Sequence, residues 1–371
     1  MWMNAVGVLF IMVMCFTPAA SADPFWMPKR QILLAGMLML SMFAQTSENK
    51  VPLALSVLGA YAALLFTGTF LWDWRIGQPQ LFPSLLGIIT ILFTLRLIQQ
   101  ATAYGLQRLA TWVSVGIILM TAFCLLQYAG LSQWLRQPTE YTGARSQQMF
   151  GTLGNHMLVG NFLAMGAPLL LMFRRLRLLY PVVLLTIFLA DNNAGLLATA
   201  ISLCVWFLFT GRHLQFYITA VITLYGAGYA VLHLSDGGRL SMWASGIKLL
   251  ITNQQGITGF GMGSVEYLFR SGIYSAVGLA PFHPHNELIF ALMELGVIGA
   301  GLLIWLFYST MRRLLYAQTS TLLAGYAAAL AASLTICMFS FPTQVPPLLL
   351  LLLIGFCGTW SLTKESRYVS A

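Results

Sequence analysis

The chain has 371 residues, of which 58% are apolar and only 8% are charged. Soluble domains carry charge on about a quarter of their residues, so the polar surface that soluble domains need is missing. A lipid bilayer removes the need for that surface, and the composition therefore predicts a polytopic membrane protein. The net charge of +9 fits Lys and Arg in short cytoplasmic loops. We expect no nucleic-acid partner, because the longest basic run is only Arg174-Arg175-Leu176-Arg177.

The five cysteines are interpreted as small apolar core residues. All of them lie inside apolar stretches, and no two stand at the spacing of metal ligands: Cys15, Cys124, Cys204, Cys337 and Cys357. The sequence therefore predicts no metal site, and it shows no cofactor motif.

The N-terminus allows two interpretations. The apolar run at residues 4–20 is followed by Ala20-Ser21-Ala22, which fits the small-residue cleavage site of a signal peptide. However, the first residues carry no Lys or Arg, whereas a signal peptide normally begins with positive charge. We expect an uncleaved first helix, with cleavage after residue 22 as the alternative.

Apolar stretches predict about twelve transmembrane helices, some of them short enough to be tilted or broken. Their approximate ranges are 4–20, 31–46, 51–72, 81–98, 109–130, 156–173, 178–193, 194–211, 214–233, 287–311, 320–341 and 345–362. The expected fold class is thus an all-α polytopic membrane protein, with residues 1–371 forming a single membrane domain.

The basic residues predict the orientation. Threading these helices places four basic segments on one side, which is then cytoplasmic together with both termini: residues 174–177, 212–213, 312–313 and 364–367. Lys29 and Arg30 fall on the outer side, against the rule. Two longer loops also lie outside, at residues 131–155 and 235–286. Since ATP, NAD and nucleotide sugars are absent there, an enzyme acting on that side needs a substrate that was energised before it crossed the membrane.

The loop at residues 235–286 is the longest interruption of the apolar sequence. Residues 239–253 have apolar side chains at helical spacing, which predicts an amphipathic helix in the membrane interface, with Trp243 at head-group depth. Arg239 and Lys248 lie elsewhere on this helix. A second short helix is predicted at residues 264–270, ending at Arg270. The glycines between the two helices predict a flexible turn rather than a nucleotide site, because no strand precedes them.

The loop ends in Phe282-His283-Pro284-His285-Asn286-Glu287, just before an apolar run. Pro284 cannot continue a helix on its N-terminal side and Asn286 is a good N-cap, so a helix is predicted to start at Asn286. The positive end of the helix dipole would keep His285 neutral and able to act as a base, and the same end attracts phosphate. Glycines at 296, 299 and 301 are expected to allow close helix packing.

Three further polar features have two interpretations each. Glu294 lies on the same face as Glu287, about 13 Å below His285, and is either a functional carboxylate or a structural hydrogen-bond partner. The segment Asp191-Asn192-Asn193 is either a tight turn or a polar patch facing the site. Arg145, in the loop at residues 131–155, either pairs with phosphate or is a solvated side chain.

Three blocks of sequence match motifs of a known family. The first is GTLGNHMLVGNFLAMGAPLLL at residues 151–171, a Gly-x-x-Gly-Asn motif leading into a helix. The second, at residues 238–264, has Gly-Arg, then Trp, then Gly-x-Gly. The third is HPHNELIFALMELGVIG at residues 283–299, with a His-Asn motif. Together these blocks resemble the O-antigen ligase and polymerase superfamily of bacterial membrane proteins, and the twelve-helix layout extends the likeness over most of the chain.

The resemblance implies both a substrate and a mechanism. Enzymes of this family take a glycan from undecaprenyl diphosphate on the periplasmic side and transfer it to lipid A-core, to a growing glycan or to a protein, without metal or nucleotide. By position, His285 matches the family's essential histidine, acting as a base on the acceptor hydroxyl or orienting it. Arg239 would bind the diphosphate and stabilise it as the leaving group, and the anomeric centre would invert. We expect His283, Asn286, Glu287, Trp243 and Lys248 to contact the substrate.

One departure from the family pattern stands near the middle of the chain. Family ligases often carry a further arginine in a Ser-Arg pair there, where this chain has Asn192-Asn193. Arg145 or Arg270 is a candidate to replace that cation. The expected activity is that of an O-antigen ligase in the bacterial inner membrane, with a polymerase or a protein O-oligosaccharyltransferase as alternatives. A transporter or flippase is the alternative of a different class, and it predicts paired repeats and discontinuous helices.

Overall fold

A computed structural model describes residues 2–15, 27–42, 56–57, 74–131, 149–233, 239–261, 263–265 and 285–365. Every regular element in these ranges is a helix, which confirms the all-helical expectation. In chain order the helices are α1 (Trp2–Cys15), α2 (Met27–Met42), α4 (Trp74–Gln100), α5 (Ala103–Tyr128), α6 (His156–Gly166), η3 (Ala167–Met172), η4 (Leu176–Leu179), α7 (Tyr180–Leu189), α8 (Asn193–Phe209), α9 (His213–His233), α10 (Arg239–Thr252), α12 (Glu287–Leu315), α13 (Thr321–Phe339), η6 (Pro342–Gln344) and α14 (Pro346–Glu365).

Four of the described helices are long and apolar enough to cross a membrane: Ala103–Tyr128, Glu287–Leu315, Thr321–Phe339 and Pro346–Thr363. Five shorter apolar helices accompany them: Trp2–Cys15, Gly87–Gln100, His156–Met172, Leu176–Leu189 and Asn193–Phe209. These findings support a membrane protein, while the number of spans stays a prediction. The predicted span at 51–72 lies outside the described residues, except for 56–57.

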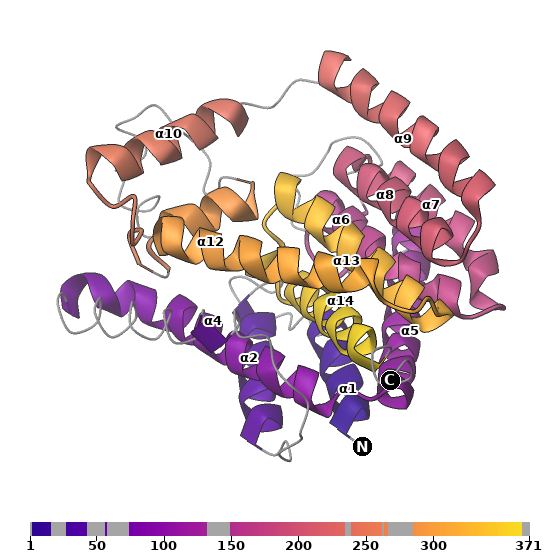
Figure 1. Ribbon diagram of the computed structural model, residues 1–371, viewed down its shortest axis with the longest axis horizontal. Helices are drawn as coiled ribbons and strands as arrows, with labels where there is room; N and C mark the ends of the chain where they lie inside the picture. The colour runs from indigo at the N-terminus through magenta and orange to yellow at the C-terminus, as the bar shows by residue number, and fades with distance from the viewer. Residues whose placement is uncertain are drawn as a thin grey trace.

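Helices α13 and α14 lie in the middle of the bundle (Figure 1). Helix α13 is rich in alanine and packs against α8 and α14, because its small side chains let neighbouring backbones approach closely. Within residues 346–363 of α14, 94% of the span is buried. A helix that is apolar on all sides is typically enclosed by protein, and the Leu-rich sequence of α14 fits that position.

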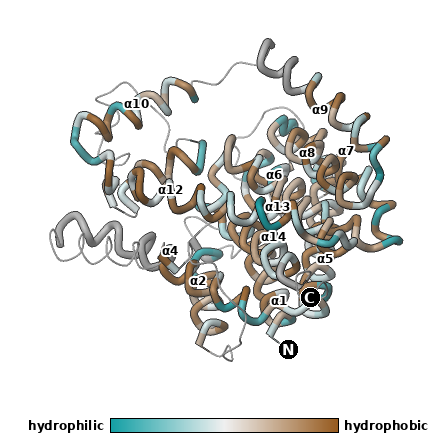
Figure 2. The backbone as a smooth tube through the Cα atoms, viewed as in Figure 1, coloured by the Kyte–Doolittle hydropathy of each residue, from teal (hydrophilic) through white to brown (hydrophobic). Residues whose placement is uncertain are grey.

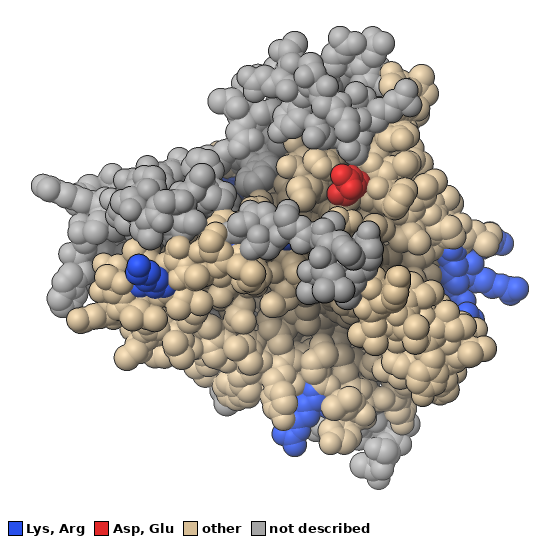
Figure 3. Space-filling view, turned by 90° about the horizontal axis from the view of Figure 1, so that it is seen from above, with Lys and Arg blue, Asp and Glu red and all other residues tan. Residues whose placement is uncertain are grey.

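The outer surface of the bundle is apolar. In Figure 2, hydrophilic residues occur mainly near the ends of helices. Among the described residues on the face shown in Figure 3, the charged side chains form a few separate patches. On α9 the large side chains of Tyr217, Val221 and Ile222 are 64 to 66% exposed. Exposed apolar surface on this scale is unfavourable in water and is what a lipid-facing helix requires.

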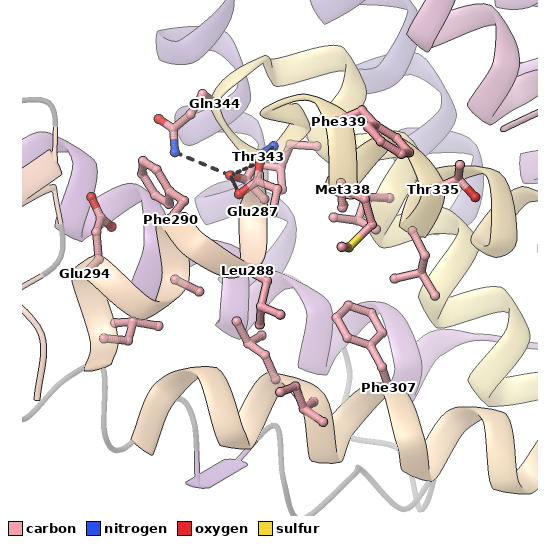
Figure 4. Close-up of a pocket in the computed structure, with 18 of the residues that line it drawn as sticks. Glu287, Leu288, Phe290, Glu294, Phe307, Thr335, Met338, Phe339, Thr343 and Gln344 are labelled. Carbon is pink, nitrogen blue, oxygen red and sulfur yellow. Dashed lines mark hydrogen bonds between the residues drawn. The ribbon is translucent and has the colours of Figure 1, made fainter. Parts of the chain in front are cut away.

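Helix α12 is broken, which corrects the expectation of one continuous helix from Asn286. Gly296 has φ +65° and ψ −170°. The first segment of α12 (residues 287–295) and the second segment (residues 297–315) run in different directions and face each other across a cavity (Figure 4). The glycines of α12 were expected to serve helix packing, but Gly296 instead creates the break, and a Cβ on Gly301 would meet no atom within 4 Å.

The backbone groups freed at the break are satisfied by the glycine turn, which we define as residues 256–261. Phe260 and Gly261 donate N–H groups to the carbonyl oxygens of Met293 and Glu294, at 2.8 and 3.0 Å. In return, the N–H of Val297 donates to the carbonyl oxygen of Gly256 at 2.9 Å. Irregular backbone at membrane depth requires such partners. The glycine turn is therefore a structural element of the break and not only the flexible connection expected.

Helix α10 forms as predicted and packs on the first segment of α12. Leu250 of α10 joins Val265 and Met293 in a small apolar core separate from that of the main bundle. The predicted apolar face is only partly buried, because Leu240 and Ile251 are 62 and 71% exposed. These outward-facing apolar side chains suit the interface position that the sequence predicts. Of the second short helix, only residues 264 and 265 are described, and both are helical.

Candidate functional site

The site is organised around the start of α12. Asn286 is the N-cap, as the sequence predicts, and its Oδ1 accepts N–H groups from Leu288 and Ile289 at 2.9 and 3.1 Å. Its Nδ2 donates to the carbonyl oxygen of Met338, near the end of α13, at 3.2 Å. Asn286 is only 3% exposed. The side chain predicted to contact the substrate thus already ties α12 to α13.

His285 occupies a constrained position in front of this cap. Its φ of +49° lies in the left-handed region, which non-glycine residues seldom adopt and which is often found at functional sites. Its ring packs edge-on against Phe341, with the ring centroids 5.1 Å apart. The backbone and the ring contact therefore fix the direction of a half-buried imidazole.

Burial, and secondly the positive charge of Arg239, lower the pKa of His285 below its usual value. The expected neutral imidazole is thus favoured by burial and by Arg239. The effect of the helix dipole, which motivated the expectation, stays a prediction. Arg239 is the first residue of α10 and is half-buried. The fold brings the two predicted catalytic residues close enough for the charge of one to act on the other.

The other predicted contacts divide into three groups. Glu287 lines the cavity, and its carboxylate accepts the backbone N–H and the hydroxyl of Thr343 at 2.8 and 2.7 Å. On α10, Trp243 is half-buried and Lys248 is exposed. The third group lies outside the described residues: His283, Arg145 and Arg270.

The predicted ranges 320–341 and 345–362 leave a connection close to residues 340–344, but sequence reasoning missed that this turn belongs to the site. The 340–344 turn connects α13 to α14 and contacts the start of α12 twice. Phe341 packs against His285, and Thr343 binds Glu287. The signal that could have found it is the polar Pro-Thr-Gln interruption at residues 342–344 of a long apolar run. The turn therefore contacts both the candidate base and the first residue of the helix that follows it.

A chain of hydrogen bonds between buried polar side chains holds the first residue of this turn. Asn192 caps α8 and donates to Asn161 Oδ1 at 3.0 Å, and Asn161 Nδ2 donates to Ser340 Oγ at 3.0 Å. All three residues are at most 5% exposed. The predicted tight turn at 191–193 is present, with Asp191 at φ +54°. Asn192 therefore helps to position the 340–344 turn through Asn161.

Lys29 and Arg30 belong to a helix and not to the loop that the sequence predicts for them. Both belong to α2, and Lys29 is fully buried, donating to the carbonyl oxygens of Met14 at 2.9 Å and of Thr152. Arg30 donates from Nη2 to the carbonyl oxygen of Gln344 at 3.2 Å. The positive-inside rule counts Lys and Arg in loops, so these two helix residues do not indicate which side of the membrane they face. Arg30 contacts the site because it binds the 340–344 turn.

A cavity of about 1080 Å³ lies beside the start of α12 (Figure 4). Apolar side chains from α4, α8, α9, both segments of α12, α13 and α14 form most of its lining. The charged residues among the described lining are Arg30, Glu287 and Glu294. The cavity is therefore amphipathic. Glu287, which lines it, stands two residues after His285 in the sequence.

Comparisons with known proteins found no match, either among protein-family models or among curated proteins. The family resemblance therefore stays a prediction. Among the described residues, no three His, Cys, Asp or Glu side chains come together as a metal site would require.

Asn286→Ala should destabilise the protein, because it removes the N-cap and the link to Met338 together. Loss of an N-cap alone costs about 0.5–2 kcal/mol. We expect thermal unfolding in detergent to shift down by several degrees. The matched control is Asn253→Ala at the exposed residue after α10, where the one hydrogen bond of the side chain to a described residue goes to Leu249 O, at 2.8 Å. Equal unfolding temperatures for the two variants would contradict this role of Asn286.

Proposed function

We propose that this protein is a membrane glycosyltransferase that moves a glycan from undecaprenyl diphosphate to an acceptor hydroxyl on the periplasmic face of the bacterial inner membrane. Lipid A-core is the first choice of acceptor, and a growing glycan or a protein side chain are the alternatives. The observation that carries the proposal is the proximity of Arg239 to His285: burial, and secondly the charge of this arginine, lower the pKa of the histidine. The pair combines a cation for a diphosphate with a neutral base.

In the proposed reaction, neutral His285 accepts the proton of the acceptor hydroxyl, or orients that hydroxyl. The acceptor oxygen forms a bond to the anomeric carbon as the bond from that carbon to the diphosphate breaks. The leaving undecaprenyl diphosphate keeps the electron pair, and Arg239 stabilises the negative charge that develops on it. Attack from the face opposite to the leaving group inverts the anomeric centre.

The cavity supports a lipid-linked donor. Its walls are mainly Leu, Ile, Phe and Met side chains, and several of them are also exposed, including Leu224 at 73% and Ile304 at 54%. An apolar space with open, lipid-like walls suits a long polyprenyl chain, whereas its charged end suits the polar part of the same molecule.

The break in α12 favours a second candidate function. Discontinuous helices that line a cavity are typical of secondary transporters, and a flippase for a lipid-linked glycan would need the same amphipathic space. A transporter would not need a neutral histidine beside an arginine, and the sequence shows no clear internal repeat. Transfer therefore remains the proposal, with transport of the same lipid as the alternative that the experiment must separate.

The test is a transfer assay with purified full-length protein in liposomes. The donor is a glycan on undecaprenyl diphosphate, and lipid A-core, free glycan and pilin-like protein are offered in turn as acceptors, with and without EDTA. We expect transfer that EDTA does not affect, and the acceptor consumed identifies the subclass. Movement of the lipid between leaflets without any transfer would overturn the proposal in favour of the flippase. Inhibition by EDTA would contradict the metal-free mechanism.

A further inference from the structure

The polar end of the cavity is built by one face of the first segment of α12. Glu287, Phe290 and Glu294 are spaced by three and four residues, which places them on the same side of a helix. Figure 4 shows the three side chains in a row along this segment, and all of them line the cavity. Along the helix, Glu287 and Glu294 are separated by about 10 Å. The row offers an aromatic ring between two carboxyl groups.

Residues from two other elements complete this end of the cavity. Gln344 lies across from Phe290 and contributes an amide, with its Nε2 at 3.4 Å from Thr343 Oγ1 (Figure 4). Arg30 of α2 also lines the cavity, and its bond to the carbonyl oxygen of Gln344 fixes its guanidinium beside the 340–344 turn. The surroundings thus combine hydrogen-bond acceptors from Glu294 with donors from Arg30 and Gln344.

The charges decide which part of a ligand suits this place. The described lining offers a diphosphate one guanidinium and two carboxyl groups, and a carboxyl group repels a diphosphate whenever it is ionised. Arg239, outside the described lining of the cavity, is the better partner for that group. A sugar ring is uncharged, has hydroxyls that both donate and accept, and has an apolar C–H face that can pack on Phe290. Its chemistry matches the mixed lining.

The depth of Glu294 points to the same kind of ligand. It is 7% exposed and stands two residues before the break in α12, where its own carbonyl oxygen accepts the N–H of Gly261. Ionisable side chains inside a membrane protein are costly and typically face a polar cavity or mark a substrate path. We propose that Phe290, Glu294, Gln344 and Arg30 form a subsite for a sugar ring of the glycan, separate from the diphosphate site at Arg239. This proposal rests on the transferase function proposed above.

The experiment compares three probes on full-length protein carrying His285→Ala, with no acceptor present, so that transfer does not disturb the binding measurement. The probes are undecaprenyl diphosphate, the same lipid carrying one N-acetylglucosamine, and a soluble oligosaccharide. We expect the sugar-bearing lipid to bind at least about tenfold more tightly than the bare lipid, equivalent to about 1.4 kcal/mol. Adding Glu294→Gln or Phe290→Leu should reduce this ratio towards one, with little change for the bare lipid. In the matched control, Phe307→Leu at the apolar end, both affinities should change by the same factor.

The outcomes separate the subsite from the transferase function. If both lipids bind with equal affinity and the oligosaccharide does not bind, the sugar subsite is wrong while the lipid-linked donor survives. If only the oligosaccharide binds, and Glu294→Gln abolishes its binding, the donor is wrong while the subsite survives. A ratio that Glu294→Gln and Phe290→Leu both leave unchanged would overturn the subsite even where every probe binds. If no probe binds, both proposals fall.

Discussion

His285→Ala is expected to lower kcat of glycan transfer by about 10²–10⁴-fold, the usual contribution of a positioned general base. The variant should still fold and bind the lipid-linked donor, because Asn286 caps α12 independently of the imidazole. The matched control is His213→Ala at the exposed start of α9, far from His285 in the chain, which should transfer at the wild-type rate. Wild-type transfer by His285→Ala would remove the proposed base, whereas loss of transfer in both variants would indicate damage unrelated to this site.

The pH profile gives this prediction a second readout. A base works in its neutral form, so activity is lost as the pH falls through its pKa. Because burial and Arg239 lower the pKa of His285 below about 6.5, the acidic limb of kcat/KM should lie below that pH in the wild type. Arg239→Gln removes one of the two causes and should shift the acidic limb to higher pH, in addition to slowing transfer. If Arg239→Gln slows transfer but leaves the acidic limb of kcat/KM at the wild-type pH, Arg239 acts only on the leaving group and does not affect the pKa of His285.

Local signals in the sequence predicted the start of α12 well. Pro284 and Asn286 indicate where the helix begins, and the N-cap forms with both expected backbone partners. The periodicity of residues 239–253 likewise predicted α10, since helical spacing is a local property. What the pattern could not give is which face of α10 is buried, because Met242, Gly246 and Leu250 face a partner that is distant in sequence.

The missed parts depend on contacts between distant segments. Nothing near Ser340 indicates a bond to Asn161, and nothing near Arg30 indicates a bond to residue 344. Gly296 was misread because a glycine in an apolar run is compatible either with close helix packing or with a break, and only the partner decides between them. That partner is the glycine turn, about 40 residues earlier in the chain. The positive φ of Gly296 is a consequence of tertiary structure and has no local signature.

Gly296→Ala should be among the most damaging single substitutions in the chain. A Cβ at this position would lie 2.1 Å from the carbonyl oxygen of Ile257, and that backbone atom is held by the glycine turn. The combination of φ +65° and ψ −170° is also nearly restricted to glycine, so strain alone costs about 1–3 kcal/mol. Expression of folded protein or its unfolding temperature in detergent should drop sharply. Gly301→Ala in the second segment of α12 is the matched control and should be neutral or stabilising by up to about 1 kcal/mol.

A second substitution at the same contact, Gly259→Ala, tests how the site is positioned. Gly259→Ala would place a Cβ 2.5 Å from the carbonyl carbon of Glu294. Gly259 belongs to the glycine turn, so this substitution disturbs the contact between that turn and the break in α12 from the side of the turn. The glycine turn follows α10, which carries Arg239, and it binds the segment that begins after His285. Weakening it should therefore separate the two residues even when the protein folds. We expect Gly259→Ala to slow transfer and to move the acidic limb of kcat/KM towards that of Arg239→Gln. A folded Gly259→Ala protein with wild-type transfer and an unchanged limb would mean that the Arg239–His285 pair is positioned by other contacts.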